Sequence, residues 1–146
     1  MHTNWQKVLR VFLNILAIYL LFDAAIHLTN IRLISVTKLW SVSALSYAIL
    51  MNAIYASFVF LAAALIWVVQ KSLKKYQDLI FISSFWAIFH GLLLIYLSYS
   101  QNFMHNFLPF SSLYVWLPFY NQYLLFEATL SFTYAGLVFL WRKSDE

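Results

Sequence analysis

Residues 42–69 read VSALSYAILMNAIYASFVFLAAALIWVV and contain no charged side chain. This run exceeds the ~20 apolar residues that a helix needs to cross the hydrocarbon core of a bilayer. Three further apolar runs flank it, at residues 9–30, 79–100 and 119–141. Each run predicts one membrane-spanning helix, because a helix satisfies its own backbone hydrogen bonds inside the membrane. We therefore expect an all-α integral membrane protein, an antiparallel four-helix bundle.

The composition predicts the same class. Of 146 residues, 64% are hydrophobic and only 10% are charged, and so few charged side chains cannot cover the surface of a soluble domain. We expect residues 1–146 to form a single transmembrane domain. The chain has no Cys, which excludes disulfides, thiolate metal ligands and Cys-ligated iron–sulfur clusters. Any bound metal would need nitrogen and oxygen ligands.

Lys and Arg are unevenly distributed over the connections between the predicted spans. One side of the membrane receives only Arg32 and Lys38, and the other receives Lys7, Arg10, Lys71, Lys74, Lys75, Arg142 and Lys143. Because basic residues stay on the cytoplasmic side, we expect both termini in the cytoplasm, N-in and C-in, in the cell (inner) membrane. The net charge of +4 is explained by this orientation, so the lipid bilayer is an expected partner and nucleic acid is not.

Small or amide residues recur at every fourth position on two of the predicted spans. They form the rows Ala48/Asn52/Ala56 and Ser83/Ala87/Gly91. Such rows let helices approach closely and form hydrogen bonds across the contact. We expect both rows to face other helices of the protein rather than lipid.

The stretch LFDAAIH, residues 21–27, places Asp23 and His27 four residues apart inside the first span. On a helix these two side chains share one face. Ionisable groups within a membrane span are costly and therefore indicate a functional site by default. This pair is the starting point of the predicted site.

Three other spans supply polar residues at similar depth. At a rise of ~1.5 Å per residue, Asp23, Asn52 and Glu127 lie roughly 4 to 5 Å to the outer side of the midplane. His90 lies near the midplane and His27 about 10 Å out. We expect these residues to form one polar centre, with a ligand-binding set of Asp23, Asn52, Glu127, Tyr123 and Tyr134.

The two carboxylates need a neutralising partner, because these spans hold no Lys or Arg near them. Protonation of the acids, a proton on a histidine, or a bound cation would each serve. For the cation, Asp23, His27, His90 and Glu127 suit a divalent transition metal such as Zn, Fe, Mn or Cu. The predicted function is an intramembrane centre near the outer leaflet that binds a cation or a proton-coupled small ligand.

Two alternatives remain open. In the first, the polar residues only hold the helices together, and the chain is a structural or accessory subunit of a homo-oligomer or a larger membrane complex. In the second, His27 and His90 ligate haem in a membrane electron carrier, although their depth difference of roughly 10 Å disfavours a shared haem plane. The sequence contains no nucleophile elbow, glycine-rich phosphate loop or Cys–His pair, so no enzymatic reaction is predicted.

Overall fold

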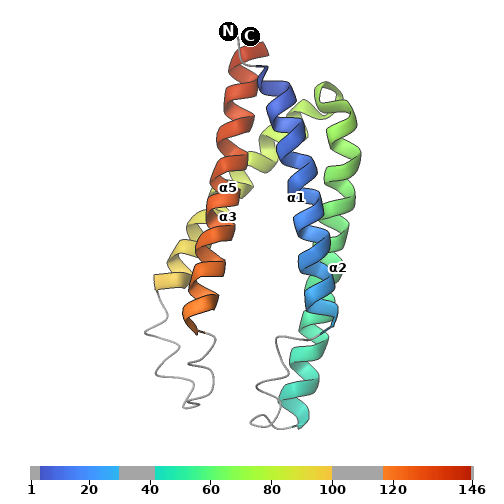
Figure 1. The fold of residues 1–146 in the computed structure, drawn as a ribbon, viewed down its shortest axis with the longest axis vertical. Coiled ribbons are helices and arrows are strands. Elements are labelled where there is room, and N and C mark those ends of the chain that lie inside the picture. Colours follow the sequence, from blue (N-terminus) through green and yellow to red (C-terminus); the bar gives the residue numbers. More distant parts are fainter. Residues whose placement is uncertain (1–3, 30–41, 100–116, 146) are drawn as a thin grey trace. The chain divides into compact units, whose positions relative to one another are not determined.

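The structure is a computed structural model that describes residues 4–29, 42–99 and 117–145. Every secondary-structure element in this part of the chain is a helix, which confirms the all-α class (Figure 1). In chain order, the elements are α1 (Trp5–Leu28), α2 (Val42–Val69), the 3-10 helix η2 (Gln70–Tyr76), α3 (Gln77–Tyr99) and α5 (Leu117–Asp145). The predicted connections over residues 30–41 and 100–116 lie outside the described residues.

The start of α1 and the end of α5 both extend beyond the predicted spans. Asn4 caps α1, because its side-chain Oδ1 accepts a hydrogen bond of 3.1 Å from the backbone N–H of Lys7. This cap places the start of the helix at Trp5, ahead of the apolar run. At the other end of the chain, α5 continues past Trp141 through the basic residues to Asp145. Helices α1 and α5 are therefore longer than their apolar portions.

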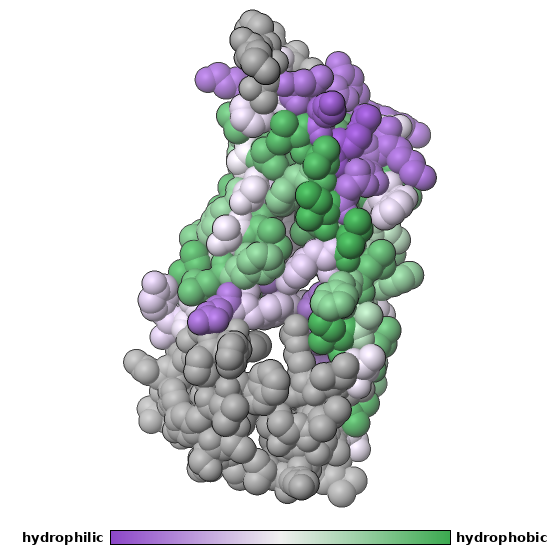
Figure 2. Space-filling view, viewed as in Figure 1, coloured by the Kyte–Doolittle hydropathy of each residue, from purple (hydrophilic) through white to green (hydrophobic). Residues whose placement is uncertain are grey.

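Among the residues that the structure describes, three helical stretches are long and apolar enough to cross a membrane: Trp5–Leu28, Ile49–Tyr99 and Gln122–Ser144. The second stretch has 51 residues, more than twice the ~20 that one crossing requires. It contains most of α2, together with η2 and α3, since the basic segment that we predicted as a loop is itself helical. The sides of the helices carry mainly apolar residues (Figure 2), as expected for an integral membrane protein.

Residue contacts divide the chain into two compact units. One comprises residues 1–9 and 73–146, and the other comprises residues 10–72. The boundary follows Ser72, whose backbone is non-helical (φ −141°, ψ 62°) between the helical residues around it. The four-helix bundle, the single domain and the orientation of the termini therefore stay predictions.

In the first unit, α3 and α5 run antiparallel, as their contacts run in opposite order along the two helices. The Phe81 and Phe139 rings meet near the start of α3 and the end of α5, with centroids 5.7 Å apart. At the other end of the pair, Leu94 packs with Leu124 and Ala128 in a buried cluster. The predicted small-residue row of α3 forms this contact face.

Gly91, the last residue of that row, allows the closest approach. A Cβ atom on Gly91 would lie 2.9 Å from Cζ and 3.0 Å from Cε2 of Phe132. Ala87, one turn earlier, is buried as well. Small residues are common at such contacts in membrane proteins because lipid gives apolar side chains little reason to prefer one another.

In the second unit, α1 and α2 share a small apolar cluster. Ala24 of α1 is buried with Ala56 and Val59 of α2, and Leu20 packs against them. Ala56 is the last member of the predicted row on α2 and is fully buried. Asn52, one turn away, is half-buried, whereas the side chain of Ala48 lies outside the described part.

The Gly91 contact predicts a matched pair of variants. Gly91→Ala forces the Phe132 ring to move, and overpacking of this kind costs about 1–3 kcal/mol. Gly136→Ala, on α5, meets nothing within 4 Å, and both variants share the gain in helix propensity of up to ~1 kcal/mol. Denaturation in mixed micelles should show Gly91→Ala less stable than Gly136→Ala by about 1–2 kcal/mol. Equal stability would show that Phe132 does not pack on Gly91.

Candidate functional site

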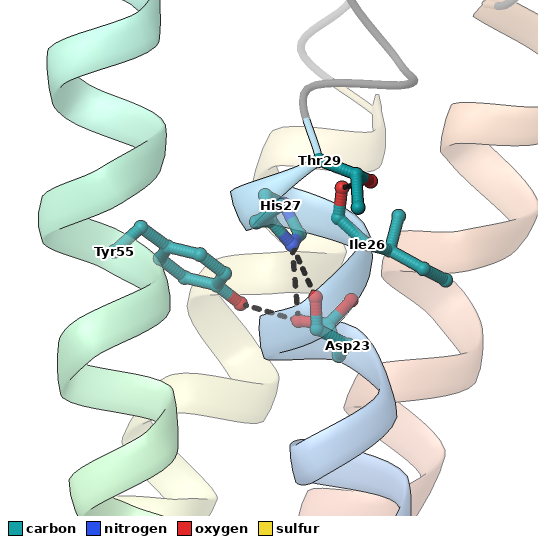
Figure 3. Close-up of polar contacts among 5 residues, drawn as sticks. All are labelled: Asp23, Ile26, His27, Thr29 and Tyr55. Carbon is teal, nitrogen blue, oxygen red and sulfur yellow. Dashed lines mark hydrogen bonds and ion pairs between the residues drawn. The ribbon is translucent and has the colours of Figure 1, made fainter.

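Asp23 lies in α1 with its carboxylate almost fully buried, at 2% exposure. Two polar groups approach its Oδ2 atom, one from its own helix and one from α2 (Figure 3). The His27 Nδ1 atom is 3.4 Å away, and the Tyr55 hydroxyl donates from the same distance. The predicted pairing of Asp23 with His27 on one helix face is therefore present, and a tyrosine completes a cluster of three residues.

The hydrogen bonding of His27 determines which ring nitrogen carries a hydrogen. Nδ1 lies 2.9 Å from the backbone oxygen of Asp23, its nearest acceptor. A carbonyl oxygen only accepts, so Nδ1 donates and holds a hydrogen in both the neutral and the protonated ring. A second proton on His27 must therefore bind at Nε2.

Tyr55 contacts both members of the pair. Its ring lies 4.5 Å from the His27 ring, centroid to centroid, with a tilt of 54° between the planes. Its hydroxyl reaches Asp23 at a distance that makes a weak hydrogen bond. The ring is 41% exposed, so Tyr55 forms the side of the cluster nearest to the surroundings of the protein.

The cluster of Asp23, His27 and Tyr55 has apolar neighbours, so a charge on Asp23 needs a partner within the cluster. Ala24, the residue after Asp23, belongs to the buried cluster with Ala56 and Val59. The described helical residues 11–28 and 42–69 contain no Lys or Arg. Within these two segments, His27 is the one side chain able to carry a positive charge beside Asp23.

The other two predicted metal ligands, His90 and Glu127, lie in the first unit. His90 of α3 is half-buried and stacks on Trp86, with ring centroids 4.8 Å apart and an angle of 9° between the planes. Glu127 of α5 is also half-buried. It follows Leu124 by three residues and precedes Ala128, both of which pack against α3.

The four predicted metal ligands are thus divided between the two units, with Asp23 and His27 in one and His90 and Glu127 in the other. Within the described ranges, no group of three or more His, Asp or Glu side chains is arranged to hold a metal ion. A metal centre made of all four residues, and haem ligation by His27 and His90, stay predictions about how the units combine.

Tyr123 and Tyr134, two further predicted site residues, both lie on α5 and contact α3. Tyr123 packs beside the cluster of Leu94, Leu124 and Ala128. Tyr134 lies 2.7 Å from the Ser83 hydroxyl, which itself donates to the backbone oxygen of Ile80 at 2.8 Å. The Tyr134 hydroxyl also lies 3.3 Å from the Ile80 backbone oxygen, to which it can donate, so either hydroxyl can be the donor between Tyr134 and Ser83.

Tyr55 is the member of the Asp23 cluster that sequence analysis missed. Its position contained a signal, because Tyr55 is next to Ala56 and three residues after Asn52, at the edge of the small-residue row. Aromatic residues are so frequent in this chain, at 21%, that helical spacing alone does not single out Tyr55. Its role follows from the contact between α1 and α2.

Comparisons of this chain with family models, with curated proteins and with solved structures found no match. The function is therefore argued from the residues themselves.

The Ser83–Tyr134 contact predicts a measurable link between α3 and α5. Tyr134→Phe removes one of the two hydroxyls and should destabilise the protein by about 0.5–1.5 kcal/mol. Combining it with Ser83→Ala should cost less than the sum of the single effects, because both remove one interaction. Ser84→Ala is the control, since the Ser84 hydroxyl bonds within its own helix, to Phe81. Strictly additive effects of Tyr134→Phe and Ser83→Ala would contradict this contact.

Proposed function

We propose that Asp23, His27 and Tyr55 form an intramembrane proton-binding centre that takes up a cation or a proton-coupled small ligand. The observation that supports this proposal best is the burial of Asp23, at 2% exposure, against an imidazole in an apolar helix. Intramembrane ionisable residues that face protein are characteristic of proton relays and of ligand and ion pathways.

The preferred charge of the pair follows from its surroundings. With one titrating proton shared between Asp23 and His27, the pair is neutral overall, either as carboxylate with imidazolium or as carboxylic acid with imidazole. Removing this proton leaves a net negative charge, and adding one leaves a net positive charge. An apolar environment disfavours a net charge, so the pair with one shared proton is the form that the surroundings solvate best.

This proton count limits what the centre can bind. A monovalent cation replaces the shared proton without changing the total charge, so its binding releases a proton to the solvent. An anionic ligand is neutralised by a second proton, which binds together with it. In both cases ligand binding is coupled to proton exchange through the same two side chains.

The wider arrangement belongs to the same proposal. Four antiparallel spans with both termini in the cytoplasm would bring Asn52, His90 and Glu127 to the depth of Asp23, and would open the centre toward the outer leaflet. A homo-oligomer or a larger membrane complex would then cover part of the apolar helix surface.

Proton binding by Asp23 can be tested with the purified protein in lipid nanodiscs. Infrared difference spectra recorded over a pH titration should contain a carboxyl signal that Asp23→Asn removes, because the amide has a similar shape but takes up no proton. Asp78→Asn is the control, since Asp78 is exposed in the first turn of α3 and its loss should leave the signal unchanged. The same spectra taken with added NaCl or MnCl₂ should show whether a cation displaces the proton.

The structural alternative makes a different prediction for these variants. If the pair only holds α1 and α2 together, an added cation should displace no proton from Asp23. Asp23→Asn would then change stability alone. That result would reject the proposed proton-binding centre in favour of an accessory role.

The predicted membrane topology can be tested separately, by cysteine labelling. Single cysteines placed at Ser72 and Ser111 of this Cys-free chain should react with a membrane-impermeant maleimide from opposite sides of the membrane, because the positive-inside pattern separates these two connections. A protein with Ser144→Cys should react from the same side as the Ser72 variant. Labelling of both the Ser72 and Ser111 variants from one side would contradict the four-span arrangement.

A further inference from the structure

Basic side chains gather at one end of the α3–α5 pair. Lys74 and Lys75 lie in η2, immediately before α3 begins, and Arg142 and Lys143 lie in the last turns of α5. Because the two helices are antiparallel, with Phe81 against Phe139, these four residues are at the same end of one unit. The three lysines are exposed and Arg142 is half-buried.

Arg142 lies at the boundary between this basic end and the apolar helix surface. Its guanidinium lies 3.9 Å from the centroid of the Phe81 ring, which in turn contacts Phe85 and Phe139 edge to face. An Arg stacked on an aromatic ring keeps N–H donors at its edge for further hydrogen bonds. Lys75 also lies over a ring, with its Nζ atom 5.4 Å from the centroid of Tyr76.

Trp141, the neighbour of Arg142, carries a donor without a partner. Its side chain is 1% exposed, and its Nε1–H makes no hydrogen bond among the described residues. Buried tryptophans normally pair this group, and an unmade hydrogen bond is costly. Because the Nε1 atom is itself buried, a lipid headgroup does not reach it in this structure, and a headgroup at this end would contact the basic side chains alone.

We propose that this basic end, made of Lys74, Lys75, Arg142 and Lys143, binds the headgroup of an anionic phospholipid. Phosphate oxygens match the planar donor edge of Arg, and the lysines add charge attraction. The carboxylates of Asp78, Asp145 and Glu146 lie nearby in the sequence, so the four basic side chains outnumber three acidic ones.

The position of the cluster favours a lipid over free phosphate. The four basic residues border helices that are apolar enough to cross a membrane, so phospholipid headgroups are the anions at that depth. Juxtamembrane clusters of Lys and Arg are attracted to anionic lipids by about 1 kcal/mol per residue, which corresponds to about a fivefold change in binding for each residue. This site is independent of the centre at Asp23.

Native mass spectrometry of the purified full chain provides the test. The protein in detergent is mixed with equal amounts of phosphatidylglycerol and phosphatidylcholine, and the retained lipids are counted. We expect the wild type to retain phosphatidylglycerol preferentially. Lys74→Gln/Lys75→Gln and Arg142→Gln should each lower this preference, by about fivefold per charge removed, whereas Arg142→Lys should keep most of it.

The control is Arg32→Gln/Lys38→Gln, which removes the same charge as the double lysine variant but from the predicted opposite side. It should keep the wild-type preference, and circular dichroism should show unchanged helix content for every variant compared. An equal loss of preference in the control, or no loss in either cluster variant, would overturn the proposal. Displacement of the lipid by inorganic phosphate, but not by chloride at equal ionic strength, would identify free phosphate as the ligand and overturn the assignment to lipid.

Discussion

Apolar contacts alone do not determine which helices pair when the helices are apolar on almost every side. An exposed Leu or Phe contacts lipid tails about as favourably as it contacts protein. The hydrophobic effect that folds soluble domains therefore gives little specificity to helix pairing here. Close shape contact and polar groups must supply it. In the α3–α5 pair, Gly91 accommodates the ring of Phe132, and the hydroxyls of Tyr134 and Ser83 form a hydrogen bond across the interface. These contacts fix the pairing of two long helices through few residues.

The same constraint gives the contact between α1 and α2 its chemical character. Small side chains at Ala24 and Ala56 let the helices approach, and the approach brings the Tyr55 hydroxyl to the Asp23 carboxylate. A carboxylate in such a place would normally require a full positive charge beside it. Here the ion-pair partner is a histidine, a residue type that gains and loses its charge near neutral pH. Packing and the proposed proton binding therefore depend on the same residues.

Much of the helical structure could be predicted because it depends on local sequence. The uncharged run at residues 42–69 coincides with α2. The four-residue spacing of Asp23 and His27 predicted that both side chains lie on one face of α1. The row ending at Gly91 identified the face of α3 that packs on α5. Each of these inferences needs only the periodicity of one helix.

The remaining features depend on contacts between helices, which periodicity does not encode. Tyr55 joined the Asp23 cluster only when α2 was placed against α1. The polar and basic composition of residues 70–78 predicts a loop, whereas residues 70–76 form a 3-10 helix with one non-helical residue, Ser72, and α3 begins at Gln77. Whether His90 and Glu127 complete the centre depends on how two units meet across that residue, and neither spacing nor depth determines this arrangement.

The central claim is that His27 and Asp23 share one titrating proton inside the membrane. The most direct measurement is the ¹⁵N NMR spectrum of the His27 imidazole, recorded in lipid bilayers over a range of pH and repeated with Asp23→Asn. The account predicts that Nδ1 carries a hydrogen at every pH, that only Nε2 titrates, and that Asp23→Asn shifts the pH at which it does so. A spectrum in which Nδ1 lacks a hydrogen in the neutral ring, or a titration that Asp23→Asn leaves unchanged, would contradict it.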